Sequence, residues 1–273
     1  LLLYLFAITS LSFSTTELVG LTFSLGVILG GMGINVAHEL GHRQSAHEKF
    51  MAKALLLPSA YMHFFIEHNR GHHKNVGTHE DPASARLNET LYHFWIRSVV
   101  YSFISAWDLE NKRLQRAHEH MWCLKNELIR FQLIQIIFWV LIGLVFGSVS
   151  LLLYTGAAIV GFLMLETVNY IEHYGLARNK VSESRYERVE PIHSWNSNHI
   201  VGRVMLFELS RHSDHHFNPA QKYQVLEYHD HSPQMPTGYP GMMLLSALPP
   251  VWFFTMNKRI RDKQKESLPV QTA

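Results

Sequence analysis

The chain of 273 residues is long enough for one or two domains, and its hydrophobic fraction of 47% is that of an ordinary soluble protein. Its 24 basic and 22 acidic residues give a formal net charge of +2, which argues against nucleic acid as a partner. The single cysteine, Cys123, excludes an intramolecular disulfide and an iron–sulfur or rubredoxin-type centre, since these need several thiolates. Any electrons that the protein uses therefore come from another protein.

The basic residues are unevenly distributed along the chain. None occurs before Arg43 and none between Arg130 and Arg178, and these two regions are also the most apolar ones. Long apolar segments without basic residues are typical of membrane-spanning helices. We therefore expect two membrane-inserted regions instead of the buried helices of a soluble protein.

Residues 1–37 predict the first transmembrane hairpin. A polar turn at 14–17 separates two apolar segments, and the second, 18–37, has the length of about 20 residues that spans a bilayer. Residues 131–170 predict a second hairpin with a break near Gly147, because this run is too long for a single span. Since the chain begins with Leu inside an apolar run, we expect it to be an N-terminally truncated part of a longer protein.

The positive-inside rule places the regions that hold all the basic residues, 38–130 and 171–273, on the cytoplasmic face. The predicted fold is therefore all-α: a single membrane-embedded domain over 1–273, built as a polytopic helical bundle. The shorter apolar run 242–256 is expected to lie along the membrane interface or in the cytoplasmic core. From Asn257 onward we expect a solvated, flexible end.

Histidine is concentrated at four places in the sequence. Nine of the 19 histidines form four compact clusters: His38 and His42; His68, His72 and His73; His173; and His212, His215 and His216. Neutral imidazole is the commonest protein ligand for transition metals, and one ion takes about three to six ligands in all. Nine imidazoles therefore predict two metal ions, held where the clusters meet at the cytoplasmic membrane surface.

The spacings within the clusters support a site with two ions. Histidines four residues apart on a helix share one face, so the pairs in the first two clusters can converge on an ion. Adjacent histidines, as in the doublets His72-His73 and His215-His216, point about 100° apart. Each doublet can thus contribute to both ions, but the division of the nine histidines between the ions is not readable from the sequence.

Polar residues beside the clusters are candidates to orient the metal-bound imidazoles by hydrogen bonding, as carboxylates often do. These candidates are Glu39, Glu67, Glu166, Glu172, Asp214 and His199. Glu166 lies at predicted membrane depth, where an ionisable group is costly and often functional. We expect no catalytic residue beyond the metal ligands.

The first cluster also fits a different class of enzyme. His38-Glu39-Leu-Gly-His42 matches the HExxH motif of zinc metalloproteases, in which two histidines hold zinc and the glutamate activates water. A protease of this kind needs only one further ligand, whereas this chain offers seven more clustered histidines. The motif by itself therefore does not decide the function.

Together the histidine boxes resemble those of the integral-membrane non-haem di-iron superfamily, which contains fatty-acid desaturases, sterol and carotene hydroxylases and alkane hydroxylases. The pattern H-x(3,4)-H, H-x(2,3)-H-H, H-x(2,3)-H-H of that superfamily is present in order. Asn-Tyr-Ile-Glu-His-Tyr-Gly at 169–175 is the discriminating segment, and with the other boxes it resembles the bacterial alkane 1-monooxygenases. The resemblance extends from Leu18 to about Tyr223.

This resemblance implies that the nine clustered histidines bind two non-haem irons. It implies that O2 supplies one oxygen atom to the terminal methyl group of a medium- or long-chain n-alkane. Rubredoxin, reduced by an NAD(P)H-dependent rubredoxin reductase, is the implied electron donor. The implied location is the bacterial inner membrane, in contact with membrane lipid, with several spans and the active site facing the cytoplasm. Members usually have six spans, of which four are predicted here.

Other classes stay open at this point. A xylene-monooxygenase-like hydroxylase, or a fatty-acyl desaturase or hydroxylase, would use the same metals on another substrate. A membrane zinc protease would need Glu39 and no electron donor. A metal transporter is least favoured, because its ionisable residues would line a path within the spans, whereas these clusters gather at one surface.

Overall fold

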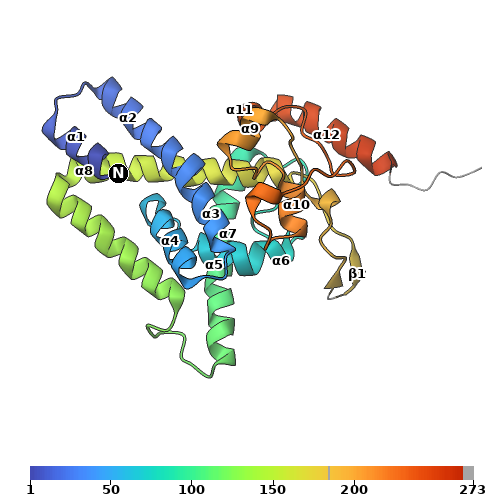
Figure 1. Ribbon diagram of the computed structural model, residues 1–273, viewed down its shortest axis with the longest axis horizontal. Helices are drawn as coiled ribbons and strands as arrows, with labels where there is room; N and C mark the ends of the chain where they lie inside the picture. The colour runs from blue at the N-terminus through green and yellow to red at the C-terminus, as the bar shows by residue number, and fades with distance from the viewer. Residues whose placement is uncertain (184, 267–273) are drawn as a thin grey trace, which may run out of the picture. The chain divides into compact units, whose positions relative to one another are not determined.

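The computed structural model describes residues 1–183 and 185–266 and is mostly helical, as predicted (Figure 1). The exception to the all-α prediction is a short antiparallel hairpin of two strands, β1 (Lys180–Ser182) and β2 (Arg185–Tyr186). The chain divides into two compact units. Unit 1 comprises Leu1–Gly71 and Tyr101–Leu165, and unit 2 comprises His72–Val100 and Glu166–Ala273.

Unit 1 begins with a short helix followed by a long apolar one. These are α1 (Leu2–Ser10) and then α2 (Thr15–Ile28), which continues through a π-helical turn, η1 (Leu29–Ile34), into α3 (Asn35–Gly41). Ser14 and Glu17 cap α2 reciprocally, since each side chain accepts a hydrogen bond from the backbone amide of the other residue. The predicted turn at 14–17 therefore forms the first turn of the helix, which extends beyond its predicted end at 37 and carries His38.

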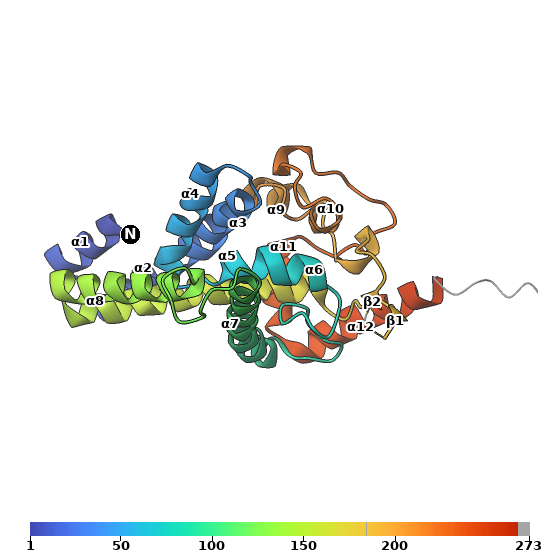
Figure 2. The same cartoon turned by 90° about the horizontal axis from the view of Figure 1, so that it is seen from below.

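Shorter helical segments follow. They are α4 (Ala46–Leu56), η2 (Leu57–Ser59), α5 (Phe64–Glu67), η3 (His68–His72) and α6 (His73–Asn75). The last three form one continuous helical stretch, whose centre is a π-helical turn (Figure 2). Two longer helices, α7 (Leu91–Arg116) and α8 (Glu127–His173), each contribute to both units.

The helix α8 folds back on itself at Gly147. The φ of 84° and ψ of 169° at this residue lie outside the helical region, in a conformation that favours glycine. Figure 1 shows the two arms of α8 on either side of this turn. The predicted break near Gly147 is confirmed.

Among the described residues, two helical segments, Thr15–Gly41 and Glu127–His173, are long and apolar enough to cross a bilayer. Only 33% and 11% of their most apolar stretches are buried, so most of their apolar side chains face outward. Leu144 and Leu152 of α8 are examples, with 78% and 71% of their surfaces exposed. A helix that turns its apolar side chains outward is typical of a membrane protein. By contrast, α1 has nine residues and is too short to span a bilayer alone.

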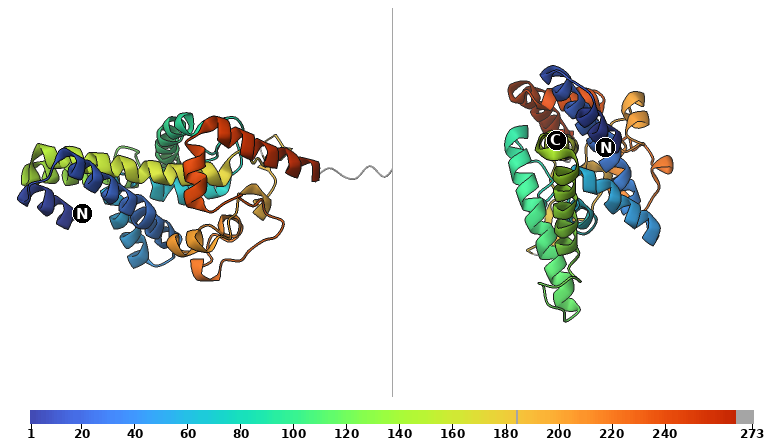
Figure 3. Two further views of the ribbon diagram at one scale, coloured as in Figure 1. Left: turned by 90° about the horizontal axis from the view of Figure 1, so that it is seen from above. Right: turned by 90° about the vertical axis from the view of Figure 1, so that its left-hand side faces the viewer.

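Glycines bring α2 and η1 close to the second arm of α8 within unit 1 (Figures 1 and 3). A Cβ atom at Gly26 would lie 2.5 Å from Cβ of Val160, and one at Gly30 would lie 2.6 Å from the carbonyl oxygen of Gly161. Both distances are shorter than van der Waals contact, so glycine is required for this approach. Small residues at the crossing are characteristic of helix pairs in membranes.

An ion network fixes the helical stretch that carries His68 to α7 and α8 within unit 1. The Arg70 guanidinium donates to Glu110 at 2.8 Å and to Glu127 at 2.9 Å. Glu110 also accepts from Arg113 at 2.6 Å and from the backbone amide of Glu127 at 2.8 Å. Burial alone would raise the pKa of Glu110, but these donors outweigh burial and lower the pKa to about 2.

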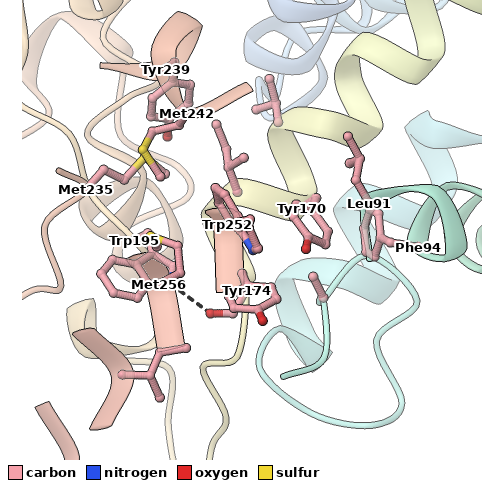
Figure 4. Close-up of a cluster of buried hydrophobic side chains, with 14 residues drawn as sticks. Leu91, Phe94, Tyr170, Tyr174, Trp195, Met235, Tyr239, Met242, Trp252 and Met256 are labelled. Atoms are coloured by element: carbon pink, nitrogen blue, oxygen red, sulfur yellow. Dashed lines mark hydrogen bonds between the residues drawn. The ribbon is translucent and has the colours of Figure 1, made fainter. Parts of the chain in front are cut away.

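The core of unit 2 is rich in aromatic side chains (Figure 4). Its later elements are η4 (Pro191–His193), α9 (Ile200–Met205), α10 (His212–Phe217), η5 (Tyr223–Val225), α11 (Tyr239–Ser246) and α12 (Pro249–Glu266). The Tyr170 hydroxyl donates to the carbonyl oxygen of Glu89 at 2.6 Å, and the Trp195 indole donates to that of Tyr174 at 2.9 Å. These bonds fasten the neighbouring loops to the end of α8, which carries His173.

The structure of α12 corrects the prediction of a flexible end beginning at Asn257. Trp252, Met256 and Ile260 follow one another at intervals of four residues, and each is at most 3% exposed. This spacing places all three on one face of the helix, which packs against the unit 2 core. Residues 267–273, the end of the predicted flexible segment, lie outside the described residues.

Replacing Gly26 by alanine is expected to destabilise the protein by about 1–3 kcal/mol, because the added methyl group collides with Val160 and nearby backbone. Gly20→Ala is the matched control, since no atom lies within 4 Å of a Cβ at that position of the same helix. In detergent, only G26A should unfold at a lower temperature. Equal unfolding temperatures for the two variants would show that α2 and α8 do not pack this closely.

The pH dependence of stability tests the ion network. The folded-state pKa of Glu110, about 2, lies below its ordinary value of 4.5, so its carboxylate stabilises the fold above about pH 4.5 and loses this effect as the pH falls toward 2. Glu110→Gln should therefore lower the free energy of unfolding at neutral pH, by an amount that shrinks below about pH 4.5. Glu119→Gln, in an exposed pair with Lys125, is the control with a smaller expected effect. A difference between E110Q and wild type that does not vary with pH would contradict the assignment.

Candidate metal centre

Four buried histidines of unit 2 turn their Nε2 atoms toward one another. We call them the tetrad; they are His72, His173, His212 and His216, each at most 3% exposed. The Nε2 atoms of His72 and His216 are 3.2 Å apart, and those of His173 and His212 are 3.1 Å apart. All four potential ligand atoms lie within 4.8 Å of one another. Three segments distant in sequence, η3, α8 and α10, thus bring four imidazoles together.

Unit 1 holds a second group, which we call the trio and which consists of His38, His42 and His68. The Nε2 atom of His42 lies 3.4 Å from that of His38 and 3.2 Å from that of His68. The ring of Phe64 stacks on that of His68, with 4.6 Å between the ring centroids. As the four-residue spacing predicted, His38 and His42 lie on one face of their helix.

His73 and His215 form a pair in unit 2, with their Nε2 atoms 3.1 Å apart. Each predicted doublet thus contributes to two groups, since His72 and His216 belong to the tetrad while His73 and His215 form the pair. The four-residue spacing of His68 and His72 does not put them in one group. Their helical stretch contains a π-helical turn, so the α-helical periodicity assumed from the sequence does not hold there.

The distances between nitrogens fit shared metal ions. Imidazole nitrogens about 2.1 Å from one ion lie about 3.0 Å apart at right angles and about 3.4 Å apart at the tetrahedral angle. The distances in the tetrad, the trio and the pair range from 3.1 to 3.4 Å. Without a cation, converging nitrogen lone pairs would repel one another in a place that excludes water. The donor sets therefore fit transition-metal ions.

The protonation of the tetrad suits metal binding. Burial lowers the pKa of His216 well below its usual range, and the neighbouring histidines lower it further, so this imidazole is neutral. The Nδ1 atom of His72 donates to the carboxylate of Asp81 at 2.9 Å, which keeps the proton on Nδ1 and leaves the Nε2 lone pair to bind an ion. A carboxylate behind a ligating histidine also makes the imidazole a better donor.

Arg97 supports the loop that carries Asp81. Its guanidinium donates to the carbonyl oxygens of Pro82 and Ser84 at 3.0 Å each, and forms a two-pronged ion pair with Glu89 at 2.7 and 2.8 Å. The Ser84 hydroxyl in turn donates to the Asp81 carboxylate at 2.6 Å. The position of Asp81 is therefore determined by buried polar contacts within unit 2.

Glu172 lies on the side of the tetrad where the ligand atoms converge. Its Oε2 atom is 3.2 Å from Nε2 of His212, and its Oε1 atom accepts a hydrogen bond from the Tyr239 hydroxyl at 2.6 Å. Burial and the adjacent carboxylate raise the pKa of Tyr239 well above its usual range, so the phenol keeps its proton and donates it. From this position the Glu172 carboxylate can supply an oxygen ligand beside the imidazoles.

Glu67 and Glu166 are both buried, at 3% and 1% exposure. Glu67 directly precedes His68 and accepts a hydrogen bond from the Ser105 hydroxyl at 3.3 Å. Glu166 accepts one from the Asn169 amide at 3.5 Å. Buried carboxylates are uncommon unless they are paired or functional, so both remain candidates for orienting the metal-bound imidazoles.

The remaining predicted partners have contacts elsewhere. Glu39 forms an ion pair with Arg43, which lies just after the end of α3. Asp214 accepts a hydrogen bond from Nε2 of His229 at 2.9 Å, which ties a later loop to α10. His199 is exposed at the start of α9. The structure thus gives Glu39 and Asp214 partners outside the tetrad, the trio and the pair, and places His199 in none of these groups.

From the sequence, Glu80 or Asp81 is expected either to cap or hydrogen-bond to the site or to belong to a plain loop, whereas Tyr239 is not expected near it. Asp81 had a local signal, because it is an acidic residue shortly after the second histidine cluster and just before Pro82. No local sequence signal pointed to Tyr239, since it lies 67 residues from Glu172 and contacts it through the packing of α11 against α8.

The model of the family described as "Fatty acid desaturase" matches residues 15–246, which include the tetrad, the trio and the pair. The chain belongs to the fatty acid desaturase family. The resemblance found in the histidine boxes is confirmed.

Among curated relatives, the chain is similar to an alkane 1-monooxygenase of Ectopseudomonas oleovorans, with 42% identity over 91% of this chain and 62% of the relative. An alkane 1-monooxygenase of Pseudomonas putida is 44% identical over 89% of this chain and 60% of the relative. The hydroxylase component of a xylene/toluene monooxygenase of Pseudomonas putida is 27% identical over 90% of this chain and 65% of the relative. This member of the desaturase family therefore spans less than two thirds of the length of these curated relatives.

Asp81→Asn is expected to weaken metal binding by about 10–100-fold, because an amide cannot hold the proton on Nδ1 of His72 as a carboxylate does. The measurement is competition for divalent metal ions between the purified protein and a chelator. Glu80→Gln, the exposed neighbour in the same loop, is the control and should bind as wild type does. Unchanged metal affinity in D81N would mean that Asp81 does not act on the tetrad.

Proposed function

We propose that this chain is the membrane-embedded hydroxylase part of an alkane 1-monooxygenase. In the proposed reaction, one atom of O2 enters a terminal C–H bond of a medium- or long-chain n-alkane to give a 1-alkanol. Two electrons and two protons convert the other atom to water. The observation that carries this proposal is the identity of 42% and 44% with curated alkane 1-monooxygenases along about nine tenths of the chain.

The proposed metals are two irons, bound by the nine clustered histidines. The tetrad provides the imidazoles for one of them. Imidazole donors alone would also suit zinc or copper, so the choice of iron rests on the family resemblance. Bound iron supplies the O2-dependent oxidation that an unactivated C–H bond requires.

The side chains around the tetrad prepare it for this role. Asp81 holds the Nδ1 proton of His72, and Tyr239 holds Glu172 beside His212, so the donors are positioned before an ion or substrate arrives. Burial of the tetrad keeps bulk water away from the site. We expect this exclusion to protect the oxidising centre from side reactions.

The apolar helices explain how such a substrate reaches the site. A terminal methyl group offers nothing for an acid, a base or a nucleophile to act on, and an n-alkane dissolves in lipid far better than in water. The outward-facing apolar surfaces of Thr15–Gly41 and Glu127–His173 support insertion into a bilayer. We propose a polytopic arrangement in the bacterial inner membrane, with regions 38–130 and 171–273 on the cytoplasmic face.

We propose rubredoxin, reduced by an NAD(P)H-dependent rubredoxin reductase, as the electron donor. The chain has one cysteine, Cys123, and therefore cannot build a rubredoxin-type centre of its own. The basic residues of the proposed cytoplasmic face favour docking of an acidic electron carrier.

The similarity to a xylene/toluene monooxygenase component favours one second candidate, a hydroxylase of methyl groups on aromatic rings. The zinc-protease alternative is weakened, because Glu39 of the HExxH motif is engaged in an ion pair with Arg43.

The deciding experiment supplies membranes that contain the protein with n-octane, O2, NADH, rubredoxin and rubredoxin reductase. Gas chromatography should detect 1-octanol, and its formation should require rubredoxin. Parallel reactions with xylene and with a saturated fatty-acyl substrate test the alternatives. Oxidation of xylene alone, or formation of an alkene, would overturn the proposal.

His212→Ala should abolish 1-octanol formation while the protein stays in the membrane, because the variant loses one of the four imidazoles of the tetrad. Iron content, measured by mass spectrometry, should fall as well. His47→Ala, which removes an exposed histidine of α4, is the control and should retain wild-type activity and iron. Full activity of H212A would remove His212 from the ligand set.

A further inference from the structure

A corner of unit 2 exposes large apolar side chains. The helices α11 and α12 meet there at a sharp turn (Figure 3), and we call the exposed residues the corner surface. These residues are Leu244, Leu248, Val251 and Phe254, with exposures of 75%, 56%, 46% and 81%. The opposite face of α12 is buried in the aromatic core of unit 2. The apolar corner is therefore held rigidly by the packing beneath it.

The first turns of α7 extend the corner surface. Tyr92, Ile96 and Val100 follow one another at intervals of four residues and are 49–71% exposed. The Tyr92 hydroxyl donates to the carbonyl oxygen of Ala247 at 2.7 Å, at the junction between α11 and α12. The exposed stripe of α7 and the corner surface thus lie side by side in unit 2.

Large apolar side chains lie on the exposed face of α7 at this place, whereas its buried face carries polar as well as apolar groups. Ser98 is fully buried and Arg97 is 9% exposed beside the buried Leu91 and Phe94, whereas Ile96 is 71% exposed. A helix in water turns its apolar residues inward. Large apolar side chains that point outward while polar groups are buried are instead favoured when the surroundings are apolar.

Along α12 the exposed face changes from apolar to basic. Val251, Phe254, Lys258 and Arg261 are spaced by three or four residues and lie on one side of the helix, all of them exposed. Near its end the helix also carries Arg259 and Lys263, with Asp262 as the acidic residue among them. An apolar half followed by a basic half matches the order of a bilayer from acyl chains to anionic headgroups.

We propose that the corner surface and the exposed stripe of α7 rest in the interfacial layer of an anionic membrane. Leu248, Val251 and Phe254 then lie at the level of the upper acyl chains, and Lys258 and Arg261 contact lipid phosphates. This contact is separate from the spanning segments and holds unit 2, which carries the tetrad, against the bilayer. A protein partner would explain an apolar patch, but it would not require the change from apolar to basic along the helix axis.

The proposal rests on the membrane insertion that the proposed function includes, but not on the reaction. Its test uses the full chain with Cys123→Ser in vesicles of phosphatidylethanolamine and phosphatidylglycerol. Single cysteines replace Val251, Phe254 or Lys258 and carry a nitroxide spin label. Relaxation by O2, which concentrates in the acyl region, is compared with relaxation by a water-soluble nickel chelate. Val225→Cys, an exposed valine of unit 2 on η5, is the matched control for Val251.

Labels at 251 and 254 should be relaxed more strongly by O2 than by the nickel chelate. The label at 225 should show the ratio of a label in water, and the label at 258 should show an intermediate ratio. The same water-like response at 251, 254 and 225 would overturn the proposal. A label at Leu144→Cys on α8 distinguishes failure of the proposed membrane insertion from failure of the proposed interfacial contact. If the label at 144 were also in water, the proposed membrane insertion would be wrong. A label at 144 in lipid together with a label at 254 in water would refute only the interfacial contact.

The basic half of α12 is tested by reversing its charge. Lys258→Glu with Arg261→Glu should move the label at 254 toward water in the anionic vesicles. In vesicles of phosphatidylcholine alone the two substitutions should have a smaller effect, since the attraction to anionic lipid is absent. An equal effect in both lipids would contradict binding of the basic residues to anionic headgroups. If 254 became shielded only when rubredoxin was added, the surface would be a protein-docking site and the proposal would be wrong.

Discussion

Neutral imidazoles that converge in a buried place are the constraint on which the rest of this structure depends. Within the tetrad, nitrogens lie 3.1 and 3.2 Å apart with almost no access to water, and a cation shared between their lone pairs would stabilise this arrangement. The fold must therefore hold each ring in one tautomer and one orientation. Asp81 does this for His72 by accepting its Nδ1 proton, and Arg97 holds the loop that carries Asp81. The polar groups behind the histidines are as much part of the centre as the ligands are.

The two units meet this requirement by different means. In unit 2, the aromatic core around Tyr170 and Trp252 fixes the end of α8, and Tyr239 from the same core reaches Glu172 beside the tetrad. In unit 1, glycines allow α2 and α8 to pack closely, and the Arg70 ion network anchors the helical stretch that ends in the second histidine cluster. Both units bury polar groups and also expose large apolar side chains, and a lipid environment favours such exposed apolar surfaces.

That distribution also gives the proposed chemistry a physical basis. The outward apolar surface of α8 suits contact with lipid, in which an alkane dissolves, while the histidines of the tetrad are buried. A hydroxylase of unactivated methyl groups needs both features, because its substrate is soluble only in lipid and its metal centre must exclude bulk water. The interfacial contact inferred for α7, α11 and α12 would keep unit 2 close to that lipid.

The sequence by itself determined the mostly helical fold, the break at Gly147, the family and the set of histidines, because apolar run length, glycine conformation and residue spacing are local properties. Only the tertiary structure decided which histidines meet. His68 and His72 are four residues apart yet belong to different groups, since the helix is π-helical between them, and the doublets divide according to which distant helix each ring faces. Tyr239 and Glu172 meet across 67 residues, and the helical order of α12 beyond Asn257 depends on burial of Ile260 in the unit 2 core. Such contacts are set by packing between segments far apart in the chain, which no local pattern encodes.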